Sequence, residues 1–342
     1  MNHAHTPAPH HSTAHDHAHD NDHTHDHNHT HAHAHPHDHQ QATAGQAEIL
    51  DLDAEVLAEH TASITAWLPL RSTPHHIVDL GCGTGAGTFA LLDRFPDAHI
   101  TAVDASAEHL QRLRAKACAR GDQERVHTVQ ADLDAATWPG LGSPDLVWAS
   151  ASMHHMTRPE RALRNVYDVL APGGLFAVVE LAGHPRFLPA GAPAERPGLE
   201  ERLHAAADRR QAEHMPHRGA DWAPMLTAAG FTIEDERTLT VNLDLTVSVE
   251  APVSGEAPVN LNGTVKNLDG TVHVDGVRRN EAVARYATGV LQRIRSAVAD
   301  RIAPEDLTAL DQLLDTGSPH GIAHRDDLTV RTERTVWAAR RA

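Results

Sequence analysis

The sequence predicts an α/β fold, a three-layer α/β/α sandwich around a mostly parallel sheet. Short apolar runs alternate with helical patterns between residues 74 and 182, and such alternation is typical of parallel strands joined by right-handed crossovers. A glycine-rich turn, Gly81-Cys82-Gly83-Thr84-Gly85, directly follows the first of these runs. Closely spaced glycines at a strand end let the backbone approach a ligand, so the turn marks a candidate binding site.

The chain begins with a histidine-rich tract. Of its 31 histidines, 16 lie within the first 39 positions, in a His-X-His pattern without apolar periodicity. Because such a segment cannot bury a core, we expect residues 1–45 to form a disordered tail. Neutral imidazole ligates Zn, Ni and Cu, so the tail is also a candidate metal-binding segment that takes no part in catalysis. The candidate ligands are His15, His17, His19, His23, His25, His27, His29, His31, His33, His35, His37 and His39.

Residues 46–342 are expected to form the folded domain. A single amphipathic helix is predicted over 46–68, before Pro69. The core, 74–182, then contains short strands separated by helices, and Ser106 is suited to cap the helix that follows the second strand. The predicted strands cover residues 77–80, 99–103, 126–130, 145–149 and 175–181.

The second half of the domain combines helices and strands. Helices are predicted over 199–215 and 221–229, and the segment 195–230 that contains them is expected to cover the acceptor side. Alternating residues and three Asn-Gly or Asp-Gly dipeptides predict a small β insertion at about 241–278. The segment 280–340 is expected to supply two helices and the last strand.

Composition excludes several classes of function. The formal net charge is −17, and residues 1–70 contain ten acidic residues but no Lys or Arg, so a basic face for nucleic acid is not expected. No run of 18 apolar residues occurs, which argues against a membrane partner. Two cysteines cannot build a disulfide framework, so the cytoplasm is the expected compartment.

Three acidic residues narrow the choice of ligand. Asp79 precedes the glycine turn, and Asp104 and Asp132 follow the second and third strands. Gly81-X-Gly83-X-X-Ala86 also satisfies the dinucleotide fingerprint, with Asp104 placed for an NAD ribose, so an NAD-linked oxidoreductase is an alternative. An anionic side chain beside the turn opposes a pyrophosphate and favours a ligand with a positive centre. S-adenosylmethionine is such a ligand, with a sulfonium, an ammonium and no phosphate.

The motifs in this order resemble those of the class I S-adenosylmethionine-dependent methyltransferases. The resemblance rests on Val78-Asp79-Leu80-Gly81-Cys82-Gly83-Thr84-Gly85, Ala102-Val103-Asp104-Ala105-Ser106, Gln130-Ala131-Asp132-Leu133, residues 145–156 and Leu170-Ala171-Pro172-Gly173-Gly174. It covers 46–181 and, more loosely, 200–247 and 281–340. It implies a Rossmann-like, seven-stranded sheet whose last strand is antiparallel.

The resemblance also implies site residues and a reaction. The glycines would contact the methionine moiety, Asp104 both ribose hydroxyls and Asp132 the adenine amino group, while Asp79 would organise the site. The implied cofactor-binding set is Asp79, Gly81, Cys82, Gly83, Gly85, Asp104, Ala105, Asp132, Leu133 and Ala149. The reaction would be methyl transfer to an O, N or C nucleophile of a small molecule.

Candidates for the acceptor side follow the fourth strand. His154 or His155 could remove a proton from the acceptor, or the pair could support the cofactor. His214 and His217 are weaker candidates, and Arg218 is one of several arginines that could contact an acidic substrate. A non-enzymatic alternative makes the protein a metal handler in which the tail is the functional part.

Overall fold

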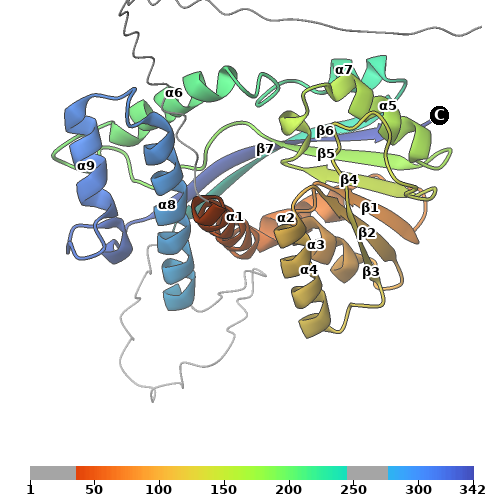
Figure 1. Cartoon of the computed structure of the whole chain (residues 1–342), viewed down its shortest axis with the longest axis horizontal. Helices are drawn as coiled ribbons and strands as arrows, with labels where there is room; N and C mark the ends of the chain where they lie inside the picture. The colour runs from red at the N-terminus through yellow and green to blue at the C-terminus, as the bar shows by residue number, and fades with distance from the viewer. Residues whose placement is uncertain (1–35, 245–275) are drawn as a thin grey trace, which may run out of the picture.

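The computed structural model describes residues 36–244 and 276–342 of the chain. Its central element is a seven-stranded sheet of order β3-β2-β1-β4-β5-β7-β6 (Figure 1). Strand β7 runs antiparallel to both of its neighbours, while the remaining pairs are parallel. The predicted fold class is therefore confirmed. The strands are β1 (His76–Leu80), β2 (His99–Asp104), β3 (Val126–Gln130), β4 (Leu146–Ser150), β5 (Leu175–Leu181), β6 (Thr232–Asp244) and β7 (Thr329–Arg340).

Helices cover both faces of the sheet because successive strand residues point to opposite sides. Ile77 packs in the core beneath α2 and α3, whereas Val78 packs in the core beneath α5 and α7. The N-cap predicted at Ser106 is confirmed, since its side chain accepts a hydrogen bond from the N–H of His109 at the start of α4. The helices are α1 (Pro36–Val56), α2 (Ala58–Trp67), α3 (Ala86–Arg94), α4 (Ala107–Arg120), α5 (Pro159–Val169), α6 (Leu199–Ala212), α7 (Ala223–Ala228), α8 (Gly276–Val298) and α9 (Pro304–Leu314), with single 3₁₀ turns η1 (Met153–His155) and η2 (Ile322–His324).

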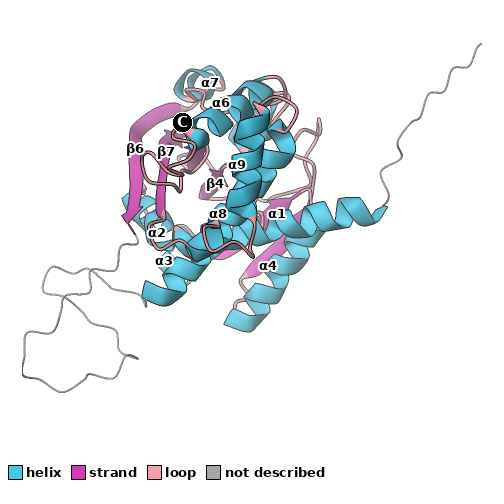
Figure 2. Cartoon of the chain, turned by 90° about the vertical axis from the view of Figure 1, so that its left-hand side faces the viewer, coloured by secondary structure: helices cyan, strands magenta, loops and turns pink. Residues whose placement is uncertain are grey.

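A second layer of helices lies beyond the carboxyl ends of the parallel strands. Figure 1 shows α6, α8 and α9 beside one another, separated from most of the sheet by α1, and Figure 2 shows α8 and α9 from that side. Leu203, Leu291 and Leu310, one from each of these helices, share one apolar core. This second layer is therefore built mainly from the second half of the chain, and its role in covering an acceptor stays a prediction.

Helix α1 is tied to both halves of the molecule. Asp51 pairs with Arg112 of α4 at 2.8 Å and also with Lys116, which donates to the carbonyl of Thr84 in the glycine turn at 3.0 Å. Asp53 accepts hydrogen bonds from Arg334 of β7 and from the Tyr286 hydroxyl of α8. These contacts fix α1 between the turn and the second layer.

The structure differs from the sequence prediction in three places. The helix expected over 46–68 is divided at Leu57, because α1 packs on α8 while α2 packs on α3. Helix α1 begins at Pro36, so residues 36–45 are helical although we expected them in the disordered tail; the alanines and glutamines at 40–44 favour a helix that residues 47–56 anchor. Residues 241–244 belong to β6 and not to an insertion.

The remaining predictions for the tail and the β insertion lie outside the described residues. This includes the metal-binding histidines, whose side chains are not described. Within the described ranges, no helix combines the length and the apolar character that crossing a membrane requires.

Candidate functional site

The glycine turn joins β1 to α3 and packs against Ser152, which lies two residues after the end of β4. Gly81 has φ +67°, and a Cβ at this position would lie 2.4 Å from Cβ of Ser152, so only glycine fits. The Ser152 hydroxyl donates to the carbonyl of Leu80 at 2.8 Å, which fixes the end of β1. Helix α1 also approaches the turn, since a Cβ at Gly83 would lie 3.2 Å from the Leu50 side chain.

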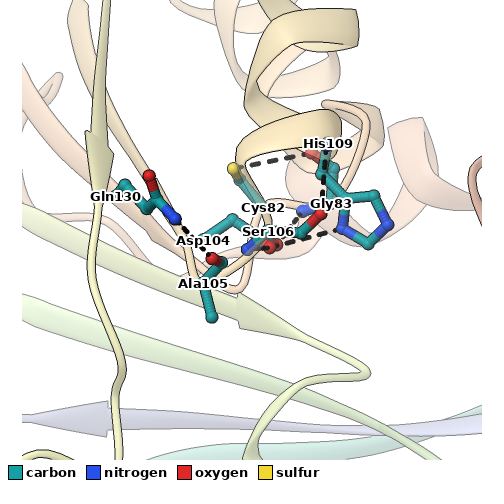
Figure 3. Close-up of polar contacts among 7 residues, drawn as sticks. All are labelled: Cys82, Gly83, Asp104, Ala105, Ser106, His109 and Gln130. Carbon is teal, nitrogen blue, oxygen red and sulfur yellow. Dashed lines mark hydrogen bonds and ion pairs between the residues drawn. The ribbon is translucent and has the colours of Figure 1, made fainter. Parts of the chain in front are cut away.

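Asp104, at the end of β2, organises the polar contacts around the turn (Figure 3). Its Oδ2 accepts from the N–H of Gly83 at 2.9 Å, and its Oδ1 accepts from the N–H of Ser106 at 2.8 Å and contacts Nδ1 of His109 at 3.3 Å. Partial burial acts to raise the pKa of Asp104, but these three hydrogen bonds outweigh it and hold the pKa below its ordinary value. Asp104 is therefore an ionised acceptor.

Asp104 retains room for one further donor. A carboxylate has about four lone-pair positions, and three are used by Gly83, Ser106 and His109. The remaining lone-pair position is on Oδ2, since Oδ1 already contacts both Ser106 and His109. The Nε2 of His109 is buried without a hydrogen-bond partner among the described residues, which leaves a second polar group for a nucleoside at this point.

Asp79 lies beneath the turn and faces α3. Its side chain is 2 % exposed, and its Oδ2 accepts from the Thr88 hydroxyl at 2.6 Å. Burial raises the pKa of Asp79 to about 7, and the nearby Asp104 adds to this effect. A Cβ at Gly87 would approach Oδ2 at 3.3 Å, so α3 passes directly over the carboxylate. Asp79 thus supports the turn from the protein side.

The structure brings most of the remaining predicted cofactor residues to the same sheet edge. Asp104 pairs in register with Gln130, whose amide donates to the carbonyl of Ala105 at 3.0 Å (Figure 3). Asp132 is exposed just beyond β3, while the adjacent Leu133 is buried in the core. Ala149 is also enclosed in the core, where it pairs with Leu80, and offers no surface to a ligand.

Cys82 is a buried thiol in the turn, with 6 % exposure. Burial raises its pKa well above the ordinary value, and the charges of Asp79 and Asp104 act in the same direction. The thiol therefore stays protonated and is unsuited to nucleophilic chemistry. Among the residues that the structure describes, no group of three His, Cys, Asp or Glu side chains has a metal-binding arrangement.

His154 and His155 lie together on η1 but have different surroundings. Nδ1 of His154 contacts Oε2 of Glu180 in β5 at 2.6 Å, and both side chains are almost completely buried. The ring of His155 lies 4.2 Å from that of His154, centre to centre, and is exposed at its outer side. Partial burial and then the charge of His154 lower the pKa of His155, so its imidazole is neutral near pH 7. His155 is the ring that can reach a ligand.

More histidines and an arginine converge beyond the end of β5. The rings of His184 and His204 lie 5.5 Å apart, and their Nε2 atoms, like Nε of Arg218, are buried without a partner among the described residues. Burial and the charge of Arg218 lower the pKa of His184 to about 3, and burial and Arg186 lower that of His204 to about 4. We call His155, His184, His204 and Arg218 the β5-edge cluster.

Only part of this site could be predicted from the sequence. Sequence reasoning identified His155 and mentioned Arg218, but it missed Glu180, His184 and His204. Of the weaker candidates, His214 is exposed, and His217 lies with its ring 6.3 Å from that of Trp222. Neither belongs to the cluster.

A cavity of about 930 Å³ lies between α1 and α8. Its lining is mostly apolar, and it includes Ile49 and Leu52 of α1 and Ala284 of α8. Arg293 of α8 lines it as well, and the charge of Arg293 also acts on His155 and His184. Arg293 is therefore the lining residue whose charge reaches the β5-edge cluster.

Comparisons with known proteins find similarity in the segment that contains the glycine turn. Residues 78–176 match the family described as "Methyltransferase domain". The chain is 40 % identical over 116 residues to trans-aconitate 2-methyltransferase of Paracidovorax citrulli, which is 34 % of this chain and 42 % of that protein. It is 36 % identical over 109 residues to malonyl-[acyl-carrier protein] O-methyltransferase of Dechloromonas aromatica, which is 32 % of this chain and 37 % of that protein.

The sequence similarity to the curated relatives is confined to part of each protein. The matches span about two fifths of the length of these curated relatives. Among solved structures, protein YcgJ of Bacillus subtilis superposes with a TM-score of 0.46 at 17 % identity, over 83 % of this chain and 98 % of YcgJ.

Proposed function

We propose that this chain transfers a methyl group from S-adenosylmethionine to a small-molecule acceptor, because residues 78–176 match the methyltransferase-domain family and are similar to methyltransferases that the comparisons find. The observation that carries the proposal is the Asp104 network, in which an ionised carboxylate with one free acceptor position lies against a bare glycine backbone. That arrangement fits a nucleoside without a phosphate group.

The chain's own residues would bind and orient the reactants. Asp104 would accept a ribose hydroxyl, and the turn from Gly81 to Gly85 would hold the amino-acid end beside its backbone. When bound, the cofactor supplies a methyl carbon that its sulfonium already activates, so the protein has mainly to align donor and acceptor. Asp132, exposed beside Leu133, is proposed to meet the adenine edge.

The proposed ribose contact is tested by Asp104→Ala. We expect this variant to bind S-adenosylhomocysteine about 10- to 100-fold more weakly, because a hydrogen bond to a charged acceptor contributes roughly 1–3 kcal/mol. Titration calorimetry measures the dissociation constant. Asp97→Ala, at an exposed position before β2, is the matched control and should bind as the wild type does. Equal affinities of both variants would contradict the assignment.

We further propose that His155 contacts the acceptor and that His154 and Glu180 position it. A neutral imidazole beside the acceptor can take up a proton when the nucleophile is protonated. The Glu180 carboxylate fixes the tautomer of His154 by accepting from Nδ1, and the His154 ring lies against His155. Neither His154 nor Glu180 is exposed enough to touch a substrate.

His155→Gln is expected to lower kcat by about 10²–10⁴-fold, the range typical of general-base catalysis, with unchanged affinity for S-adenosylhomocysteine. In the wild type, kcat should fall at acidic pH as His155 becomes protonated, below the ordinary pKa of 6.5 because the pKa is lowered. His127→Gln, exposed on β3, is the control. If the fall in kcat at acidic pH persists in the His155→Gln variant, another group removes the proton.

A further inference from the structure

The β5-edge cluster has more positive charge than its own carboxylates neutralise. Arg218 and Arg293 have no hydrogen bond or ion pair to any described residue, and Nε of Arg218 is buried. Of the nearby carboxylates, Glu180 is engaged by His154, and Asp208 is exposed and 3.9 Å from His184. Arg218 is half-buried and Arg293 is exposed, but the buried Nε of Arg218 is an unsatisfied donor beside two charges that no described carboxylate neutralises, so an anion from outside the chain would stabilise this arrangement.

Neutral histidines complete a binding site for a carboxylate. His184 and His204 are deprotonated near pH 7, so each ring carries one N–H donor. Each has a buried Nε2 without a hydrogen-bond partner among the described residues, and that of His184 lies 3.9 Å from Asp208. His204 is 3 % exposed, so bulk solvent does not reach its Nε2. Together with Arg218, the two rings offer the planar fork and the additional donors that carboxylates prefer.

The adjoining cavity is elongated and apolar. Its lining residues on α8 extend from Glu281 to Ala297, a distance of about 24 Å at 1.5 Å per residue. Its volume, about 930 Å³, is at the upper end of the range of small-molecule sites. A compact tricarboxylic acid would leave most of this space empty, and its additional charges would face an apolar wall.

The charged residues that line the cavity differ in sign along its length. Toward the Ala297 end of the lining, Arg293 has no ion-pair partner among the described residues, and its charge acts on His184 of the cluster. At the other end Glu281 and Glu48 line the wall, and Glu48 pairs with Arg285 at 2.6 Å. A ligand with one anionic end and one apolar end can therefore bind in only one orientation, with its anion beside Arg293.

We propose that the acceptor is a carboxylic acid with an extended apolar body, whose carboxylate anchors on Arg218, Arg293, His184 and His204 while the body occupies the cavity between α1 and α8. This proposal rests on the proposed function, because it defines the acceptor of the same site. It places the anchoring group beside His155.

Binding of a carboxylate series to the protein saturated with S-adenosylhomocysteine tests this directly. Calorimetry with acetate, hexanoate, decanoate, decanamide and trans-aconitate should show affinity that rises with chain length and is at least tenfold weaker for decanamide than for decanoate. Equal binding of decanamide, or preferred binding of trans-aconitate, would overturn the proposal. Failure of S-adenosylhomocysteine itself to bind would instead contradict the proposed function.

Two variants separate the anchor from the cavity. Arg218→Gln should weaken decanoate binding at least tenfold, with partial recovery in Arg218→Lys, while Arg164→Gln, exposed on α5, should have no effect. Thr288→Phe, which fills the cavity, should weaken decanoate but not acetate. If Arg218→Gln fails to fold in a thermal melt, Arg293→Gln provides the same test. Unchanged decanoate affinity in both a folded arginine variant and Thr288→Phe would refute the assignment.

Discussion

Asp53→Ala should lower the free energy of unfolding by about 3 kcal/mol, because it leaves a buried guanidinium without its partner. Both oxygens of Asp53 accept from Arg334, at 3.0 and 2.8 Å, and Arg334 is 6 % exposed. The Tyr286 hydroxyl, which donates to the same carboxylate at 2.6 Å, loses its acceptor as well. Breaking a buried pair typically costs 3–5 kcal/mol, and the partial exposure of Asp53 places the expected value at the lower end.

Urea denaturation measures this loss, and a double variant identifies its cause. Asp53→Leu combined with Arg334→Met removes both charges, so it should be more stable than Asp53→Leu alone. Glu55→Ala, exposed on the same helix, serves as the control for helix propensity. Equal stabilities of Asp53→Leu and the double variant would show that helix packing, and not the unpaired Arg334, causes the loss.

The parallel core could be predicted because its signals are local. Each short apolar run gave one strand, and Ser106 marked the start of α4. The site residues at the turn could be predicted for the same reason, since neighbouring parallel strands bring Asp104 and the end of β3 to one edge. His109 follows the cap residue Ser106 by three residues, about one helical turn. Its contact with Asp104 could therefore also have been predicted from the sequence.

The acceptor side could be predicted only in part because its residues meet through tertiary packing. Glu180 had a usable signal, as a lone carboxylate in the otherwise apolar run 175–181, where burial requires a partner. His184 and His204 had none, since one lies in a loop and the other on α6, and their contact depends on how the second layer packs. The pairing of Asp53 with Arg334 spans almost the whole chain and likewise left no pattern in the sequence.

Asp79→Asn should stabilise the protein at neutral and alkaline pH. Burial raises the pKa of Asp79 to about 7 from an ordinary value of 3.8, so the folded state holds a proton that the unfolded state releases. Stability is therefore lost as pH rises from about 4 to 7 and is constant above that. The loss in the wild type is on the order of 4 kcal/mol. Asparagine does not titrate, and its carbonyl oxygen can still accept from Thr88.

The decisive quantity is the difference in unfolding free energy between Asp79→Asn and the wild type, measured in urea at pH 4.5 and at pH 8. This difference should grow in favour of the variant toward pH 8, whatever the fixed packing cost of the substitution. Asp97→Asn, at an exposed position, should leave the difference constant, and parallel profiles for Asp79→Asn would contradict the raised pKa. A protein that retains a destabilising carboxylate beneath the turn is expected to gain function from its charge. An ionised Asp79 favours a cationic ligand. Asp79→Asn should therefore weaken the binding of S-adenosylmethionine, whose sulfonium is charged, more than that of S-adenosylhomocysteine, whose sulfur is uncharged.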